Sequence, residues 1–356
     1  MSELEHRLQH YRSARGWSQA EVARRSTLSR AAISAIETGR VVPSTAAALA
    51  LAAAFGCRVE DLFTLRDPAS VQQSRWAWAP PTEPCQFWRA AIGERTLLYP
   101  VEPTAVGRLP ADGIVRSGTQ EVREHSDPAR VLVIAGCDPA VGLLREEVLR
   151  TAGLQVLPLI RSSGQALELL RSGLVHVAGI HLQDAGAPAE NARAVRASLG
   201  PGWTLLRVTR WQEGVALAPG VDARSIREVV SAKLRWVARE KGSGARRCLE
   251  AIFRGHRHAR DQFEHMASDH RGVVETLRTG WAQAGICIRL CAAEAELGFL
   301  LAREEDYDLC YRTDLQDDPR IRALFNAIRS HAFRRSIGEL PGYCADDTGS
   351  VTQVTA

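Results

Sequence analysis

Two short turns in the C-terminal half of the chain place serine and glycine directly before a helical pattern. They are Ser162-Ser163-Gly164 and Gly242-Ser243-Gly244, and Arg246 lies in the first helical turn after the second one. A helix start presents free N–H groups and a partial positive charge, which suit an anion or a polar oxygen. We therefore expect the three serines and Arg246 to contact a ligand. The competing interpretation is that the serines only cap their helices and that Arg246 pairs with Glu250.

Three further side chains occupy positions where open α/β sheets bind ligands. Asp138 and His181 follow the first and third strands of the predicted sheet, and His270 precedes a predicted helix. Ligands of such sheets bind at the carboxyl ends of the strands. A carboxylate beside a free oxyanion costs free energy, so this set favours an organic ligand over a molybdate-like oxyanion. Alternatively, Asp138 only shapes the turn before Pro139, and His181 hydrogen-bonds within the core.

The eight cysteines include no CxxC pair, so we expect neither a structural zinc site nor a cofactor. Reduced and mostly buried thiols are the default for such a chain. Cys287 and Cys291 lie four residues apart, and Cys310 follows a predicted strand. Three thiols would suit a soft metal ion or a redox switch, although a strand over residues 284–288 would spoil the helical spacing. A metal or redox site at these cysteines therefore remains an alternative.

The elements that must position these residues alternate between strand and helix from Arg130 onward. This alternation predicts an open sheet with helices on both faces. A second segment of the same kind covers residues 234–302, and the tail after about Asp346 is predicted to be disordered. The preceding stretch, residues 67–128, is rich in Trp and Pro and predicts a linker followed by short strands. The first three predicted strands of the sheet are 131–135, 154–160 and 175–180.

The N-terminal fifth of the chain has a different composition. Residues 1–66 hold nine arginines and six acidic residues, whereas the whole chain has a net charge of +4. A small basic domain attached to a near-neutral remainder indicates nucleic-acid binding. Ser18 and Ser29 fit the N-caps of short helices, and Gly39 and Gly56 fit their ends. The pattern predicts a bundle of short helices over residues 3–64.

The first 64 residues resemble the helix-turn-helix domain of the phage-repressor (Cro/CI, or XRE) class. The resemblance rests on Ser18-Gln19-Ala20-Glu21-Val22-Ala23, the turn Ser26-Thr27-Leu28, the segment 29–37 and Gly39-Arg40. It implies that helix 30–37 enters the major groove of operator DNA. Arg30 would contact guanine and Arg40 a phosphate, whereas a bundle that binds protein would leave Arg30 merely solvated. The expected DNA-contacting residues are Gln19, Ser29, Arg30, Ala31, Ser34, Ala35 and Arg40.

Residues 130–340 resemble the periplasmic-binding-protein-like domain, related to molybdate-type binding proteins, that is found behind such helix-turn-helix domains. The matching segments are 136–140, 162–167, 177–182, 242–246 and 307–309. The resemblance implies two α/β lobes with a ligand cleft between them. Trp281-Ala282-Gln283 departs from the pattern, which has an Ala-Asp pair there, and leaves the ligand open. The expected parts are a helix-turn-helix domain (1–66), a β-rich linker (67–128), a two-lobed domain (129–345; lobe 1 about 129–215 and 303–345, lobe 2 about 216–302) and a disordered tail (346–356).

The sequence shows neither a membrane-spanning segment nor a secretory signal. No apolar run reaches the roughly 18–20 residues of a membrane-spanning helix. The polar start lacks the apolar stretch and cleavage pattern of a secretory signal. We therefore expect a cytoplasmic protein without a membrane partner.

Together these features predict a one-component transcription regulator. Double-stranded operator DNA would bind the first domain of a homodimer, and a small polar or anionic effector would bind the cleft and modulate that binding. One alternative is a metal- or redox-sensing regulator that uses the cysteines. The other is an enzyme with an accessory DNA-binding domain, in which Cys137, Asp138 and His181 supply a nucleophile, an acid and a base. No nucleophile elbow, metal-binding helix pair or phosphate-binding loop surrounds those three residues, so we predict a protein that is not an enzyme.

Overall fold

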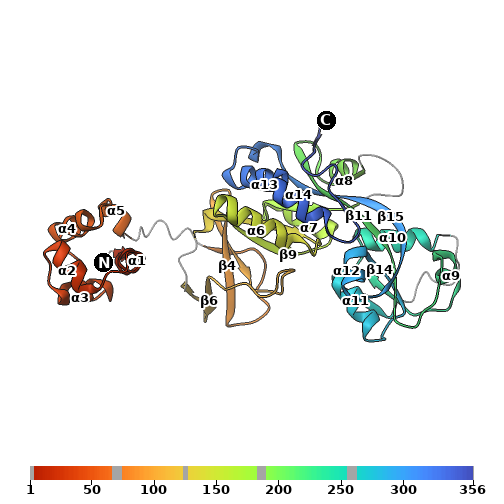
Figure 1. Cartoon of the computed structure of the whole chain (residues 1–356), viewed down its shortest axis with the longest axis horizontal. Coiled ribbons are helices and arrows are strands. Elements are labelled where there is room, and N and C mark those ends of the chain that lie inside the picture. Colours follow the sequence, from red (N-terminus) through yellow and green to blue (C-terminus); the bar gives the residue numbers. More distant parts are fainter. Residues whose placement is uncertain (1–3, 66–73, 123–126, 183–189, 255–262, 356) are drawn as a thin grey trace. The chain divides into compact units, whose positions relative to one another are not determined.

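The computed structural model describes residues 4–65, 74–122, 127–182, 190–254 and 263–355. The chain divides into two compact units, Met1–Gln73 and Ser74–Ala356 (Figure 1). The first unit is mainly helical, and the second is built on β-sheets with helices packed on them. The predicted fold class, an all-α domain followed by a two-lobed α/β domain, is confirmed.

Serine side chains begin the central helices of the N-terminal unit, as predicted. The hydroxyl of Ser18 accepts a hydrogen bond from the N–H of Glu21, and that of Ser29 accepts one from the N–H of Ala32. Between these helices Thr27 adopts a left-handed conformation with φ of 56°, which reverses the chain sharply. The helices of this unit are α1 (Leu8–Ala14), α2 (Gln19–Ser26), α3 (Arg30–Glu37), α4 (Thr45–Phe55) and α5 (Val59–Leu62).

A short antiparallel pairing joins the two ends of the N-terminal unit. Strand β1 (Leu4–His6) pairs with β2 (Phe63–Leu65). Helical spacing predicts a helix from Leu4, but α1 begins only at Leu8. Leu8 is fully buried together with Val22 and Leu51. The apolar spacing therefore indicates which residues lie in the core, and it does not show where the helix begins.

The β-rich segment that follows belongs to the second unit. Its sheet has the strand order β3-β5-β4-β6-β7. The hydroxyl of Tyr99 donates to the carbonyl of Leu174 at 2.7 Å, and Trp88 and Tyr99 share a core with Val133 of the first lobe. The short strands agree with the prediction, and burial of these large rings makes them part of the second domain. Residues 67–73 of the predicted linker lie outside the described residues. Its strands are β3 (Arg75–Trp76), β4 (Cys85–Ile92), β5 (Arg95–Pro100), β6 (Gly113–Arg116) and β7 (Thr119–Val122).

Lobe 1 carries the predicted repeat of parallel strands and helices. Its strands pair in the order β10-β8-β9, all parallel, and nearly every residue of β8 and β9 is buried. Such apolar runs are typical of parallel strands covered on both faces. The elements are η1 (Pro128–Arg130), β8 (Val131–Gly136), α6 (Val141–Ala152), β9 (Gln155–Ile160), α7 (Ser163–Arg171), β10 (Val177–Ile180), α8 (Glu190–Leu199), η2 (Thr313–Leu315), α13 (Pro319–Arg329) and α14 (His331–Gly338).

Lobe 2 repeats the arrangement on a smaller scale. Strand β12 pairs in parallel with both β13 and β14. The predicted strand over 284–288 coincides with β14. The elements are α9 (Ile226–Ser231), β12 (Trp236–Arg239), α10 (Gly244–Ile252), β13 (His265–Ala267), α11 (His270–Arg278), β14 (Ala284–Ile288) and α12 (Arg289–Glu294).

Two long antiparallel strands, β11 (Trp203–Leu217) and β15 (Gly298–Arg312), run through both lobes (Figure 1). They pair with each other along their whole length, with β10 of lobe 1 beside β15 and β14 of lobe 2 beside β11. The predicted α/β segment over 234–302 ends in a short strand at 298–302, so the sequence predicts only the first part of β15 and no strand at 203–217. The predicted lobe boundaries, near residues 215 and 303, therefore fall inside continuous strands.

The predicted disorder of the tail is wrong for residues 346–355, which the structure describes. Strands β16 (Tyr343–Cys344) and β17 (Val351–Val354) both pair with β11. Val354 is buried in the lobe 1 core. The polar sequence of the tail predicts no strand. The tail is nevertheless ordered because its backbone N–H and C=O groups pair with those of β11.

Candidate functional site

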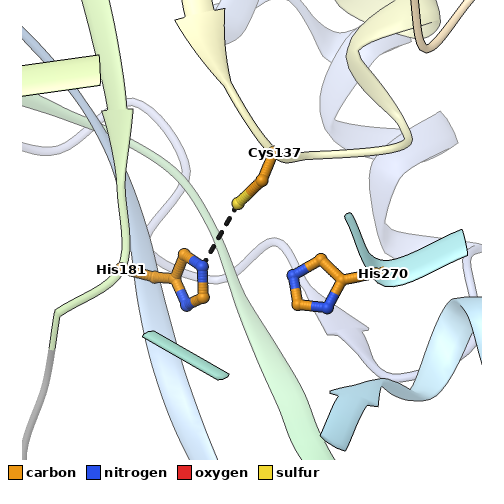
Figure 2. Close-up of side chains that lie close together, drawn as sticks. All are labelled: Cys137, His181 and His270. Carbon is orange, nitrogen blue, oxygen red and sulfur yellow. Dashed lines mark hydrogen bonds between the residues drawn. The ribbon is translucent and has the colours of Figure 1, made fainter. Parts of the chain in front are cut away.

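The polar residues predicted at the strand ends meet where the two lobes face each other. Cys137 and Asp138 follow β8, and His181 follows β10, both in lobe 1. His270 is the first residue of α11 in lobe 2. Figure 2 shows Cys137 and His181 facing His270 from the opposite lobe. The structure thus brings Asp138, His181 and His270 into one region, together with Cys137, which the sequence offered only as part of an enzyme.

A chain of three buried polar groups starts at Cys137. Its Sγ lies 3.2 Å from Nε2 of His181, and Nδ1 of His181 lies 2.8 Å from Oε2 of Glu305. Glu305 comes from β15 and is fully buried. Burial by itself lowers the pKa of His181, but the adjacent Cys137 and Glu305 outweigh it and raise that pKa well above its ordinary value.

His270 is buried without a hydrogen-bond partner. Asp269 caps α11 by accepting from the N–H of Gly272 at 2.7 Å, which fixes His270 at the start of the helix. The residue is 1% exposed, and within the described residues neither ring nitrogen has a partner. Burial lowers the pKa of His270 well below its ordinary value, and the charges of Arg239 and His181 lower it further. A neutral imidazole in this position is free to bind an added group.

A pocket of about 220 Å³ opens beside these residues. Asp138 lies on its wall, where its Oδ1 accepts from the hydroxyl of Tyr343 at 2.7 Å and from the N–H of Ala140 at 2.9 Å. Burial raises the pKa of Asp138. The pocket is lined by the β-rich segment and by both lobes, including Thr104, Ala105, Cys137, Asp138, Ile160, Asp269, His270, Arg271 and Tyr307.

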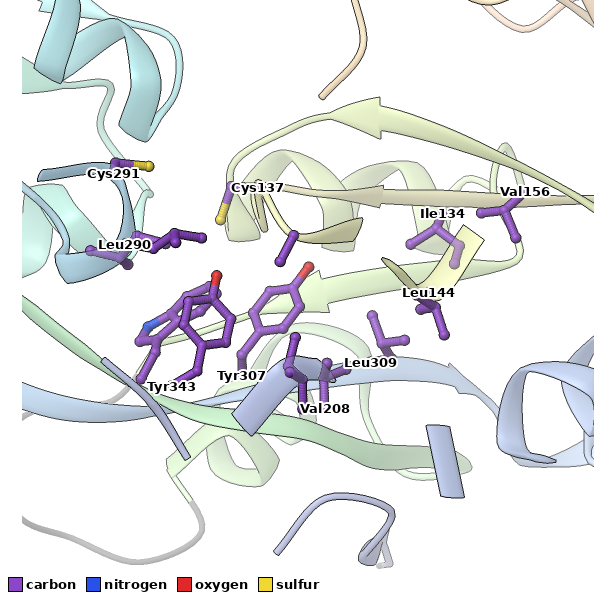
Figure 3. Close-up of a cluster of buried hydrophobic side chains, with 14 of the residues drawn as sticks. Ile134, Cys137, Leu144, Val156, Val208, Leu290, Cys291, Tyr307, Leu309 and Tyr343 are labelled. Carbon is purple, nitrogen blue, oxygen red and sulfur yellow. The ribbon is translucent and has the colours of Figure 1, made fainter. Parts of the chain in front are cut away.

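Apolar packing surrounds the polar groups on the lobe 1 side and continues into lobe 2. Figure 3 shows Tyr307 and Tyr343 between Ile134 of lobe 1 and Leu290 of lobe 2. The ring of Tyr307 stacks on Trp211, with centroids 4.6 Å apart. Nε1 of Trp211 is another buried donor without a partner in the described chain.

A buried ion network lies on the two long strands behind His181. Arg303 donates to Oε2 of Glu213 at 2.8 Å and to the carbonyl of Gly244 at 3.1 Å, and it also contacts Glu305. Burial raises the pKa of Glu213 to about 7, with a further contribution from the nearby Glu305. A side chain at Gly244 would collide with His181, so glycine at this position allows lobe 2 to close on lobe 1.

The predicted serine turns do not line the pocket. Ser162 caps α7, Ser163 accepts from the backbone N–H of His181 at 3.0 Å, and Ser243 caps α10. Arg246 donates to Glu250 at 2.7 Å and lies over the ring of Phe263. These contacts fit the competing interpretation, in which the serines cap their helices and Arg246 pairs with Glu250. The ligand contacts of these residues stay a prediction.

The three cysteines of the alternative site are not brought together. Cys287 and Cys291 lie in the core that spans both lobes, whereas Cys310 lies in the core shared by lobe 1 and the β-rich segment. Burial raises the pKa of all three thiols. The groups of possible metal ligands found among the described residues do not include them.

The predicted DNA-contacting surface lies on the first turn of α3 and the residues around it. Ser29, Arg30, Ala31 and Arg40 are exposed, and Ser34 and Ala35 are half-buried. Gln19 donates to Glu37 at 2.8 Å, and Arg12 pairs with the same carboxylate. Arg30 has no ion pair within the described part of the N-terminal unit, so its guanidinium is available to DNA.

Comparisons with known proteins agree with this architecture. Residues 146–329, just over half of the chain, match the family described as the PBP superfamily domain, and residues 3–63 match a helix-turn-helix domain. The chain belongs to the PBP superfamily and carries an N-terminal helix-turn-helix domain. The helix-turn-helix domain implies DNA binding, and the PBP-like domain implies a small ligand.

Two curated relatives cover different parts of the chain. The uncharacterized protein YvgK of Bacillus subtilis (strain 168) is 23% identical over 245 residues, which are 66% of this chain and 78% of that protein. The uncharacterized HTH-type transcriptional regulator MJ0272 of Methanocaldococcus jannaschii is 34% identical over 64 residues, which are 18% of this chain and 97% of that protein. The N-terminal unit therefore has a relative described as a transcriptional regulator.

Two solved structures illustrate the similarity of this chain to known proteins. PhnD1 from Prochlorococcus marinus in complex with methylphosphonate is 12% identical, covers 64% of this chain and 94% of its own, and gives a TM-score of 0.43. A reduced form of OxyR from N. meningitidis is 14% identical, covers 60% of this chain and 98% of its own, and gives a TM-score of 0.43.

Within the described residues of the chain, no helix has the length and apolar character needed to span a bilayer.

Proposed function

We propose that the protein is a one-component transcription regulator of the cytoplasm. A homodimer binds operator DNA through α3, and a small effector bound between the lobes changes the affinity for that DNA. Catalysis is no part of the proposal. Its basis is the fusion of a helix-turn-helix domain to a PBP-like domain.

One observation supports the effector site most directly, namely a pocket whose polar wall comes from both lobes. Asp138 belongs to lobe 1, and His270 and Arg271 belong to lobe 2. A ligand that contacts both walls binds the closed arrangement better than an open one. It therefore shifts the population towards closure, as a regulatory ligand must.

The character of the pocket indicates the class of effector. Its volume of about 220 Å³ is below the roughly 300–1,000 Å³ of pockets that take drug-sized ligands. Its wall includes the carboxylate of Asp138 and the imidazole of His270, whose ring nitrogens have no partner among the described residues. An imidazole can either donate or accept a hydrogen bond. We propose a small organic molecule that carries hydroxyl, amine or carboxylate groups, rather than a bare oxyanion.

Closure of the lobes must reach the DNA through the arrangement of the dimer. Helix-turn-helix dimers bind half-sites about one helical turn apart. A change in the distance between the two copies of α3 therefore changes how well both fit their half-sites. The coupling free energy between effector and operator would be about 1–3 kcal/mol, the usual range for such systems.

The experiment uses the full chain in two steps. Thermal-shift measurements against amino acids, small organic acids, phosphate and molybdate identify the effector, because a ligand at 100 times its Kd adds about 2.7 kcal/mol of apparent stability. Titration into the chain bound to DNA from its own upstream region then tests regulation. We expect an organic hit that changes operator affinity about 5- to 150-fold. Stabilisation by molybdate alone would contradict the proposed effector class.

A variant that fills the pocket locates the effector. Ala105 lies on the pocket wall, and Ala105→Trp would occupy the space without removing a polar group. We expect this variant to bind operator DNA normally and to lose the response to the effector. Arg246→Ala, outside the pocket lining, serves as the matched control and should keep the response. An unchanged response in Ala105→Trp would place the effector elsewhere.

A further inference from the structure

We propose that Cys137, His181 and His270 together bind a thiophilic d¹⁰ metal ion, Zn²⁺ or Cu⁺, that bridges the two lobes. The ligand atoms of these three buried residues all lie within 4.8 Å of one another. This site differs from the cysteine site suggested by the sequence, and it does not depend on the proposed regulation of DNA binding.

The distances suit a metal ion with little rearrangement. In a tetrahedral site with Zn–S of about 2.3 Å and Zn–N of about 2.0 Å, neighbouring donor atoms lie about 3.5 Å apart. The observed distance between Sγ of Cys137 and Nε2 of His181 is 3.2 Å. Small rotations of the side chains would place the ion between them and bring His270 to it (Figure 2).

The donor set determines the class of ion. One thiolate and two imidazoles suit Zn²⁺ and copper, whereas Mg²⁺ and Ca²⁺ require oxygen ligands. The second group of possible ligands, His181 with Glu213 and Glu305, is a poorer candidate. Arg303 already contacts both carboxylates, and its fixed positive charge would repel a cation there.

Glu305 holds His181 in the orientation that a metal ligand needs. Its Oε2 lies 2.8 Å from Nδ1 of His181, so that Nε2 of the same ring faces Cys137. Metal-binding histidines commonly direct their second nitrogen to a carboxylate in this way. Glu305 is therefore a positioning residue for the site.

His270 is the residue that favours a metal site over a reactive thiol as the interpretation of this cluster. The Cys137–His181–Glu305 chain alone would also suit a reactive thiolate, whose base is oriented by a carboxylate. That interpretation leaves His270 unexplained, although its buried ring nitrogens have no partner in the described chain and one of them lies within reach of both other donors. Arg239, whose charge lowers the pKa of His270, is paired with Glu240 at 3.0 Å. A metal ion accounts for all three side chains.

The test follows metal binding directly in the full chain after chelation under reducing conditions. Co²⁺ is added as a spectroscopic substitute for Zn²⁺, and Cu⁺ is titrated against a chromogenic chelator. We expect one Co²⁺ per chain, with a thiolate-to-cobalt charge-transfer band that Zn²⁺ removes. Cys137→Ser should abolish the band, and His270→Ala should weaken binding at least 10-fold. Glu305→Gln should weaken it by about 10- to 100-fold, as for other carboxylates that orient a ligand.

Cys291→Ser is the matched control, because Cys291 is equally buried but lies outside the proposed ligand set; it should keep the band. The proposal would be overturned if the parent chain binds neither Co²⁺, Zn²⁺ nor Cu⁺, or if Cys137→Ser keeps the band. Selective alkylation or oxidation of Cys137 without metal binding would favour the reactive thiol instead and would also overturn it. Circular dichroism of each variant shows that it is folded, so a lost band reports a lost ligand. Operator binding measured on the same samples keeps this outcome separate from that of the proposed function.

Discussion

Two polar side chains without a partner, one from each unit of the molecule, have opposite surroundings. In the N-terminal unit Arg30 is exposed and has no ion pair among the described residues, and water solvates it at no cost. In the second unit His270 is buried and has no partner among the described residues, which costs about 1–3 kcal/mol for each unsatisfied group. An unpaired surface charge therefore says little by itself, whereas an unpaired interior group such as His270 needs an explanation, which a bound ligand would supply.

The largest effect that we expect comes from breaking the interior network. Arg303→Met would leave Glu213 and Glu305 buried without their common cation. Loss of one partner from a buried ion pair typically costs about 3–5 kcal/mol, and urea unfolding should show a loss of this size. Arg335→Ala, which removes an exposed pair with Glu339, should cost less than about 1 kcal/mol. Equal losses in the two variants would show that the interior network is no more important than a surface pair.

A second prediction concerns an interior histidine in the folded lobe. His176 accepts from the N–H of Val133 at 3.0 Å, and its other nitrogen lies 2.9 Å from the carbonyl of Ala91. Burial, followed by the charge of Arg320, lowers the pKa of His176 to about 4. The unfolded chain takes up this proton near pH 6.5, so stability is lost as the pH falls from about 6.5 to 4. The loss is about 3 kcal/mol at 1.36 kcal/mol per pKa unit.

His176→Gln removes this titration and should flatten the pH dependence of the free energy of unfolding by up to one proton between pH 6.5 and 4.5. The exposed His331 provides the control, since His331→Gln should leave the slope unchanged. If both variants follow the parent curve, the buried ring does not stay neutral in the folded lobe.

A third prediction concerns the exposed arginines of the N-terminal unit. Arg30→Ala should weaken operator binding by about 1–3 kcal/mol and relax the base preference at one position. Arg40→Ala should weaken binding to all sequences about equally and reduce the salt dependence. Fluorescence anisotropy on single-base operator variants measures both effects. A preference that survives intact in Arg30→Ala would exclude α3 as the sequence-specific element.

The smallest expected effect is that of Arg246→Ala on effector affinity. Because Arg246 pairs with Glu250 on a partly exposed helix face, its loss should change the Kd of the effector less than about threefold by calorimetry. A large loss of affinity would restore the serine turns as the ligand site and contradict the placement in the pocket.

Local patterns predicted the N-terminal unit well because its determinants are close in sequence. The caps Ser18 and Ser29 act on residues three positions away. The α/β repeat of lobe 1 was predictable for the same reason. Strands β11 and β15 were largely missed, because charged residues such as Arg303 and Glu305 look unsuited to a buried strand until the opposite charges meet.

The site itself depends on contacts between distant residues. Cys137 and His181 are separated by 44 positions and His181 and Glu305 by 124. The rule that ligands bind at strand ends pointed to Asp138 and His181, and the start of a predicted helix pointed to His270. It gave no signal for Glu305, Trp211 or Arg303, whose roles arise only from the pairing of the two long strands. The serine turns stay open to both interpretations, because capping and anion binding begin with the same residues.

The effect of the effector on operator affinity, measured in parent and Ala105→Trp chains side by side, tests the central claim most directly. That claim is that a pocket shared by the two lobes controls DNA binding by α3. We predict a change of at least fivefold in the operator Kd for the parent when the effector is saturating, and no change for Ala105→Trp, whose operator affinity without effector matches that of the parent. The same change in both proteins, or none in the parent, would contradict the account.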